Sequence, residues 1–192
     1  MENTSSFIGI AMAITTLLTV FIFYIASNRS AIFLLIAIGW LILQAALALS
    51  GFYDVTNTLP PRFILLPGPP LLAIIILFST AAGRRFIDGL DAKWLLLLHS
   101  VRIAVEIILW LLYLQGSLPK IMTFEGSNFD ILAGLSALFI FYFAYVKKKI
   151  GRYGLLIWNI LCMLLLINIV IIAILSAPTP MQQFGFEQPN IA

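Results

Sequence analysis

Long apolar runs separated by short polar segments fill most of the chain. A helix needs about 20 mostly apolar residues to cross a bilayer, and each run approaches or reaches that length. The segment before the first run, MENTSS, has no basic residue, so we expect a retained span rather than a signal peptide. The pattern predicts an all-α, polytopic membrane helix bundle with six transmembrane helices in one domain, residues 1–192. The spans are 6–26, 31–51, 63–82, 94–115, 129–146 and 153–176, followed by a polar external tail, 177–192.

Composition agrees with this pattern and narrows the chemistry. The 192 residues are 62% hydrophobic and 10% charged, whereas a soluble domain is about 45–50% apolar and about 25% charged. Cys162 is the only cysteine and His99 the only histidine, so an intramolecular disulfide and a paired-histidine haem site are excluded. We expect no metal site and no cofactor. Basic residues are not interleaved with aromatic ones on a polar face, so we expect no nucleic-acid partner.

The distribution of Lys and Arg predicts the orientation. The loops after spans 1, 3 and 5 hold eight of these residues, and the loops after spans 2 and 4 hold two. Because basic loops stay on the cytoplasmic side, loops 1, 3 and 5 should be cytoplasmic and both termini outside. Anionic lipid is the expected partner of the basic group in the fifth loop, which comprises Lys147, Lys148, Lys149 and Arg152.

The stretch LHSVRIAVEIILW, residues 98–110, places three ionisable residues inside an apolar run. At about 100° per residue, His99, Arg102 and Glu106 fall on one helical face. Arg102 and Glu106 lie close to the middle of the span, where a charge costs about 2.5 to 3.5 kcal/mol. We therefore expect this face to line an enclosed polar site, with Arg102 and Glu106 free to pair at i, i+4. The alternative is a purely structural lock between helices.

The loop MTFEGSNFD, residues 122–130, should lie outside, just before span 5. Ser127 and Asp130 fit a helix start signal, so Asp130 is either a cap or a ligand of the polar site. Glu125 is either a solvated carboxylate or an external partner of the site. Gly126 suits a turn with positive φ.

A second predicted outer loop, PPRFILLPGPP at 60–70, holds five of the nine prolines. It is either a stiff connection or a re-entrant segment, and proline-interrupted segments mark binding sites in transporters. Both outer loops lie on the side toward which Glu106 points. We therefore expect a cavity that opens outside, with Asp54 and Arg62 near its mouth.

The strings LHSVRIAVEIILW, MTFEGSNFDILAG and PPRFILLPGPP resemble an uncharacterised family of bacterial multi-spanning integral membrane proteins. The likeness covers roughly residues 60–140. It implies a location in the bacterial cytoplasmic (inner) membrane and brings no assigned activity.

Three functions remain open from the sequence. The first is binding or transport of a small polar solute or a proton at a site made of His99, Arg102, Glu106, Glu125 and Asp130. The second is a membrane-embedded enzyme acting on a lipid or isoprenoid-like substrate, for which the sequence lacks a nucleophile motif. The third is a structural or accessory membrane subunit. Small residues at Ala133 and Ala137 allow close helix contact, either within the chain or in a homo-oligomer.

Overall fold

The computed structural model describes residues 6–55, 58 and 60–191, and the regular structure in those residues is helical. Five helical stretches are long and apolar enough to cross a membrane, and a sixth, Ile131–Val146, is apolar but shorter. The predicted all-α membrane bundle is therefore confirmed. The five stretches are Ser6–Ala26, Ala31–Leu49, Arg62–Ser79, Ala92–Leu114 and Arg152–Ser176.

The chain divides into two compact units. The first contains residues 1–19 and 93–192, and the second contains residues 20–92. Helix α1, Ser6–Ala26, begins in the first unit and ends in the second. The prediction of a single domain stays a prediction.

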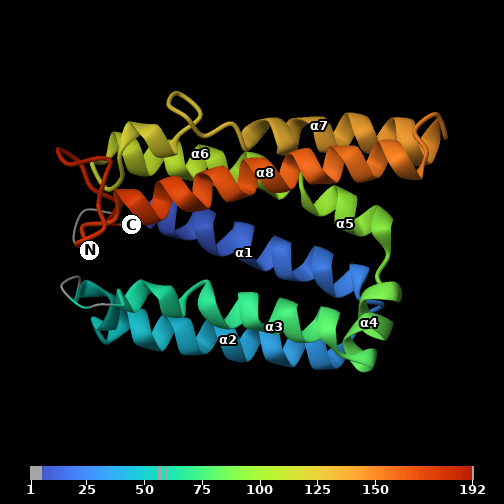
Figure 1. The fold of residues 1–192 in the computed structure, drawn as a ribbon, viewed down its shortest axis with the longest axis horizontal. Helices are drawn as coiled ribbons and strands as arrows, with labels where there is room; N and C mark the ends of the chain where they lie inside the picture. The colour runs from blue at the N-terminus through green and yellow to red at the C-terminus, as the bar shows by residue number, and fades with distance from the viewer. Residues whose placement is uncertain (1–5, 56–57, 59, 192) are drawn as a thin grey trace. The chain divides into compact units, whose positions relative to one another are not determined.

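The first unit contains α5 (Ala92–Leu98, from Lys93 onward), α6 (Val101–Leu114), α7 (Ile131–Phe141) and α8 (Arg152–Ser176). Figure 1 shows α7 and α8 running lengthwise beside each other, with α5 and α6 forming a bent rod. One buried apolar cluster joins Ile8 of α1 to α6 and α8, and a second joins Leu96 of α5 to α7 and α8. Ala133 and Ala137 are buried in this second cluster, so their close contact is within the chain.

The predicted span 94–115 is interrupted near its middle. Helix α5 ends at Leu98 and α6 begins at Val101, and the residues between them form a turn. The amides of His99 and Ser100 bond three residues back, to the carbonyls of Leu96 and Leu97. Such a tightened stretch within a helix often marks a functional site. Continuous helical geometry over 94–115, which the sequence predicted, is therefore wrong at this point.

The segment before α7 is the second departure from six simple spans. Helix α7 has 11 residues and a π-helical end, Tyr142–Val146, adds 5. Together they cover roughly 24 Å, less than the hydrocarbon core of about 30 Å. The segment 117–130 has no α-helix, contains a 3-10 turn at Lys120–Met122, and is largely packed inside the unit, with Leu118, Thr123 and Asn128 at 0% exposure. It is an inward-packed loop rather than the surface loop that the sequence predicted.

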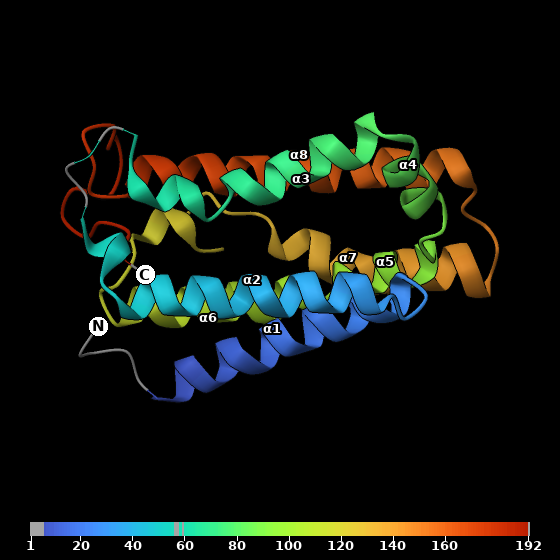
Figure 2. The ribbon, with the colours of Figure 1, turned by 90° about the horizontal axis from the view of Figure 1, so that it is seen from below.

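The C-terminal tail folds back on the ends of α6 and α8, as Figure 2 shows in red. Gln188 Nε2 donates to the carbonyls of Tyr113 and Leu118, at 2.9 and 2.6 Å. Asn190 Nδ2 donates to Ala173 O at 3.2 Å. Amide side chains therefore hold the tail, whereas Phe186 is 72% exposed.

The second unit contains the end of α1, α2 (Ala31–Leu49), α3 (Gly68–Ser79), α4 (Ala81–Asp88) and 3-10 turns at Phe52–Asp54 and Arg62–Leu65. Thr80 ends α3 and caps α4, where its hydroxyl accepts from Gly83 N at 3.1 Å. The predicted span 63–82 therefore ends at Ser79, because the backbone turns at Thr80. Neither α2 nor α3 buries a residue, as expected for helices that hydrocarbon surrounds.

Candidate functional site

Three polar contacts connect α6 to the inward-packed loop, one for each helical turn. Trp110, Glu106 and Arg102 are spaced by four residues and contact Glu125, Asn128 and Asp130, respectively. The loop therefore runs antiparallel to α6 and carries Asp130 roughly 18 Å below the last residue of α6, about three turns. A non-helical backbone at such depth is tolerated where protein covers it.

The deepest of these contacts is a buried ion pair. Arg102 Nη1 lies 2.5 Å from Asp130 Oδ1 and donates a second hydrogen bond, of 3.2 Å, to the carbonyl of Cys162. Asp130 precedes α7, and Cys162 lies in the middle of α8. One guanidinium thus joins three segments. The predicted pairing of Arg102 with Glu106 is replaced, since Asp130 is the carboxylate within ion-pair distance of Arg102.

The side chain of Asp130 consequently does not cap α7. It occupies the position before Ile131, but its side chain makes no capping hydrogen bond. Its backbone amide donates to Asn128 Oδ1 at 3.1 Å, which holds the carboxylate toward Arg102. Ser127 is the other half of the predicted start signal. Its backbone amide donates to Ile121 O, and its carbonyl accepts from Asn168 Nδ2.

The middle contact joins Glu106 to Asn128. Asn128 Nδ2 lies 2.7 Å from Glu106 Oε1, 2.8 Å from Oε2 and 3.0 Å from the carbonyl of Met122. Glu106 is 1% exposed and Asn128 is fully buried. The carboxylate of Glu106 is thus held by a neutral amide in the interior of the unit.

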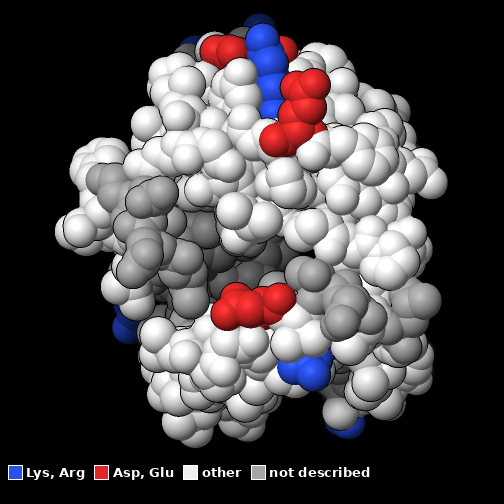
Figure 3. All heavy atoms as spheres, turned by 90° about the vertical axis from the view of Figure 1, so that its left-hand side faces the viewer, with Lys and Arg blue, Asp and Glu red and all other residues white. Residues whose placement is uncertain are grey.

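The outermost contact lies near the surface. Trp110 Nε1 donates to Glu125 Oε1 at 2.9 Å, and Lys120 Nζ lies 3.7 Å from Glu125 Oε2. The Lys120 and Glu125 side chains are 57% and 42% exposed. Figure 3 shows how sparse charged side chains are on the face at that end of the molecule. Glu125 therefore contacts α6, as the sequence allowed, but one turn away from Glu106.

His99 lies at the break between α5 and α6 rather than beside Glu106. Its ring meets Trp158 edge-on, with the centroids 4.8 Å apart, and it shares a side-chain hydrogen bond with Asn159. Its Nδ1 is buried and has no hydrogen-bond partner among the described atoms. The backbone carbonyl of His99 accepts from Arg102 N at 3.1 Å, so the histidine positions the start of α6.

The residues predicted at the mouth, Asp54 and Arg62, belong to the second unit. Arg62 donates to the carbonyl of Phe52 at 3.4 Å and lies over the Phe52 ring, 5.0 Å from its centroid. Gln44 accepts from the hydroxyl of Tyr53 in the same unit. The contacts of Arg62 and Gln44 described here therefore lie within the second unit.

Sequence reasoning missed Asn128, which connects Glu106 to Asp130. An uncharged residue in a predicted surface loop gave no reason to place it at the site. The available signal was its position between Glu125 and Asp130, two residues that were already candidates. The carbonyl of Cys162 could not have been found, because backbone groups in a helix interior leave no trace in the sequence.

Comparisons with known proteins add no name: no family model, curated protein or solved structure matches the chain.

Proposed function

We propose that this membrane protein binds a proton at Glu106 and transfers it between the site and the outer side of the bacterial inner membrane. Loops 1, 3 and 5 would face the cytoplasm. The proposal rests on one observation: Glu106 is fully enclosed, and a neutral amide is its hydrogen-bond partner.

Charge counting supports a proton at this place. The contacts of α6 with residues 128–130 bring together one guanidinium, Arg102, and two carboxylates, Asp130 and Glu106. If all three were ionised, one negative charge would remain uncompensated among these three groups. An uncompensated buried charge costs several kcal/mol, and a bound proton removes it. Because Asp130 is the ion-pair partner of Arg102, Glu106 is the group we assign to the proton.

Enclosure favours a proton over a larger polar solute. Both oxygens of Glu106 contact the amide of Asn128, and neither residue is exposed by more than 1%. A solute would have to displace Asn128 and the loop that carries it. A proton needs only a transient hydrogen-bonded path.

The discontinuous elements around the site also support this function. In transporters, interrupted helices meet near the middle of the bilayer and supply the binding site. Here the break at residues 99–100 lies just before Arg102, the second residue of α6, and α7 begins directly after Asp130. The same elements would allow local movement without unfolding a continuous helix.

A second function, that of a structural or accessory subunit, is supported by the contacts of Arg102. This side chain joins α6 to Asp130 and to Cys162 O, as a lock between helices would. We assign the two roles to different pairs. Arg102 and Asp130 hold the helices together, and Glu106, with Asn128 as its partner, exchanges the proton. The proposal of a lipid-modifying enzyme has no comparable support from a specific contact.

Infrared difference spectroscopy of the reconstituted protein tests the assignment. Between neutral and alkaline buffer, where exposed carboxylates stay ionised, the parent should show a carbonyl band of a protonated carboxyl group that shifts in heavy water. Glu106→Gln should lose this band. Glu125→Gln, which alters an exposed carboxylate of the same loop, should keep it. A band that persists in Glu106→Gln, or a parent without one, would show that Glu106 does not exchange a proton.

A further inference from the structure

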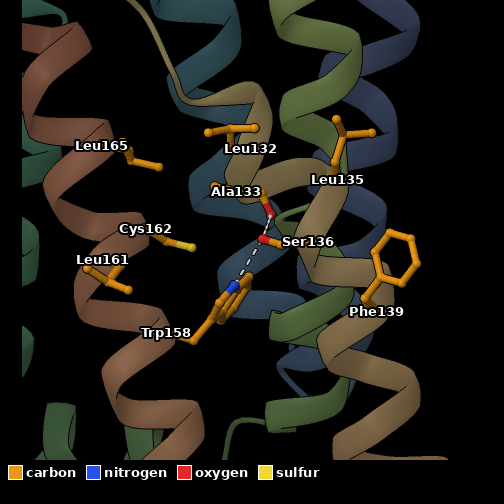
Figure 4. Close-up of a pocket in the computed structure, with 9 residues that line it drawn as sticks. All are labelled: Leu132, Ala133, Leu135, Ser136, Phe139, Trp158, Leu161, Cys162 and Leu165. Carbon is orange, nitrogen blue, oxygen red and sulfur yellow. Dashed lines mark hydrogen bonds between the residues drawn. The ribbon is translucent and has the colours of Figure 1, made fainter.

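An apolar groove lies between α7 and α8. It has a volume of about 380 Å³. Figure 4 shows the lining side chains, which come from two helices. Those from α7 are Leu132, Ala133, Leu135, Ser136 and Phe139, and those from α8 are Trp158, Leu161, Cys162 and Leu165.

The groove has a floor of small residues and rims of large ones. Ala133 and Cys162 are 1% and 2% exposed, whereas Leu161 at the rim is 55% exposed. Leu135 and Phe139 raise the opposite rim on α7. The groove is therefore open along the exposed surface of two apolar helices.

The polar atoms of the groove are already engaged. Trp158 Nε1 donates to Ser136 Oγ at 3.0 Å, and the Ser136 hydroxyl donates to the carbonyl of Ala133 at 3.3 Å. Figure 4 draws both bonds across the floor. Since the donors of both side chains are used internally, the groove offers little to a polar ligand.

We propose that the acyl chain of a membrane lipid occupies this groove. Water is a poor occupant, because cavities lined by apolar atoms stay dry. An empty groove would forfeit dispersion contacts along its lining. A flexible hydrocarbon chain is abundant around α7 and α8 and can enter along the open side.

The occupant would lie next to a residue that also contacts the ion pair. The side chain of Cys162 lines the groove, while the carbonyl of the same residue accepts from Arg102. A bound chain would therefore fill the space next to the backbone on which Arg102 rests. This inference does not depend on proton exchange at Glu106, and either can fail without the other.

Fluorescence quenching by brominated acyl chains tests the proposal. The reporter is Trp158 in a chain that carries Trp40→Phe, Trp94→Phe and Trp110→Phe, reconstituted in phosphatidylcholine bilayers with or without bromine on the chains. Quenching of Trp158 is expected in the brominated bilayer. Cys162→Leu, which fills the floor, should largely abolish the quenching. Leu161→Phe, which narrows the groove from its rim, provides a second variant should Cys162→Leu fail to fold.

Leu164→Phe is the matched control. Leu164 is also 55% exposed on α8 but does not line the groove, so its replacement should leave quenching unchanged. Equal quenching in the parent, Leu161→Phe and Leu164→Phe would overturn the proposal, because the chain would then contact Trp158 by another route. Absence of quenching in the parent, together with cross-linking of two copies through residues 132–139, would assign the groove to a second copy instead.

Discussion

The loop before α7 takes part in two ion pairs, one that joins Asp130 to Arg102 of α6 and one between Lys120 and Glu125 within the loop, and the two pairs differ in nearly every physical respect. Arg102 and Asp130 lie 2.5 Å apart with side chains 18% and 7% exposed, whereas Lys120 and Glu125 lie 3.7 Å apart and are largely exposed. If one partner of the Arg102–Asp130 pair is removed, the remaining buried charge has no counter-charge. If one partner of the Lys120–Glu125 pair is removed, water solvates the remaining charge. A pair of a basic and an acidic side chain therefore stabilises the fold where it is buried and contributes little to stability where it is exposed.

The largest loss of stability should follow from removing one partner of the Arg102–Asp130 pair. Asp130→Asn retains the volume but leaves the guanidinium of Arg102 without its carboxylate. The expected loss in free energy of unfolding is about 3–5 kcal/mol, as for other buried pairs with one partner removed. Equilibrium unfolding in mixed micelles, followed by far-ultraviolet circular dichroism, measures this loss.

Replacing both partners refines the test. Arg102→Met combined with Asp130→Leu leaves no charge behind, so the double variant should be more stable than Asp130→Asn. If the double variant were the less stable of the two, the cost would come from lost packing rather than from an isolated charge.

An intermediate effect is expected where α6 and α7 approach most closely. A Cβ added at Gly134 would lie 2.8 Å from Ile103 Cγ1 and 3.0 Å from Ile103 N. Gly134→Ala should therefore destabilise the protein by about 1–3 kcal/mol through overpacking, measured by the same unfolding transition. Gly39→Ala, in the interior of α2 with nothing within 4 Å of its added Cβ, is the matched control and should not destabilise. Equal losses in the two variants would refute the close approach.

The smallest effect belongs to the outer pair. Lys120→Ala should change the free energy of unfolding by about 0–1 kcal/mol, since exposed pairs contribute little and salt screens them. Repeating the unfolding at high salt should reduce even this difference. A loss comparable to that of Asp130→Asn would mean that Lys120 is buried in the membrane-embedded protein.

The sequence predicted the helices well where long apolar runs define them. The predicted 6–26 and 153–176 agree within one residue with Ser6–Ala26 and Arg152–Ser176. The break at His99 and Ser100 was not predictable, because neither residue forbids a helix. Tertiary contacts decide it, among them the contact of His99 with Trp158 and the close packing of Gly134 on Ile103.

The loop before α7 shows where local rules fail. The start signal Ser127 to Asp130 has the right spacing, but the long-range attraction of Arg102 takes the carboxylate that would have capped the helix. Gly126 was expected to provide positive φ. It is required instead because its Cα lies against the backbone of Lys120 and Ile121, leaving no room for a side chain. Both errors arise from treating a packed segment as a surface loop.

Disulfide cross-linking tests most directly whether this loop descends along α6. In a Cys162→Ala background, Glu106→Cys with Asn128→Cys should cross-link under mild oxidation in membranes, as a mobility shift would report. Trp110→Cys with Asn128→Cys moves one partner a full helical turn and should cross-link far less. Efficient cross-linking of 110 with 128 and none of 106 with 128 would contradict the account, because the loop would then stay near the surface and Asp130 could not reach Arg102.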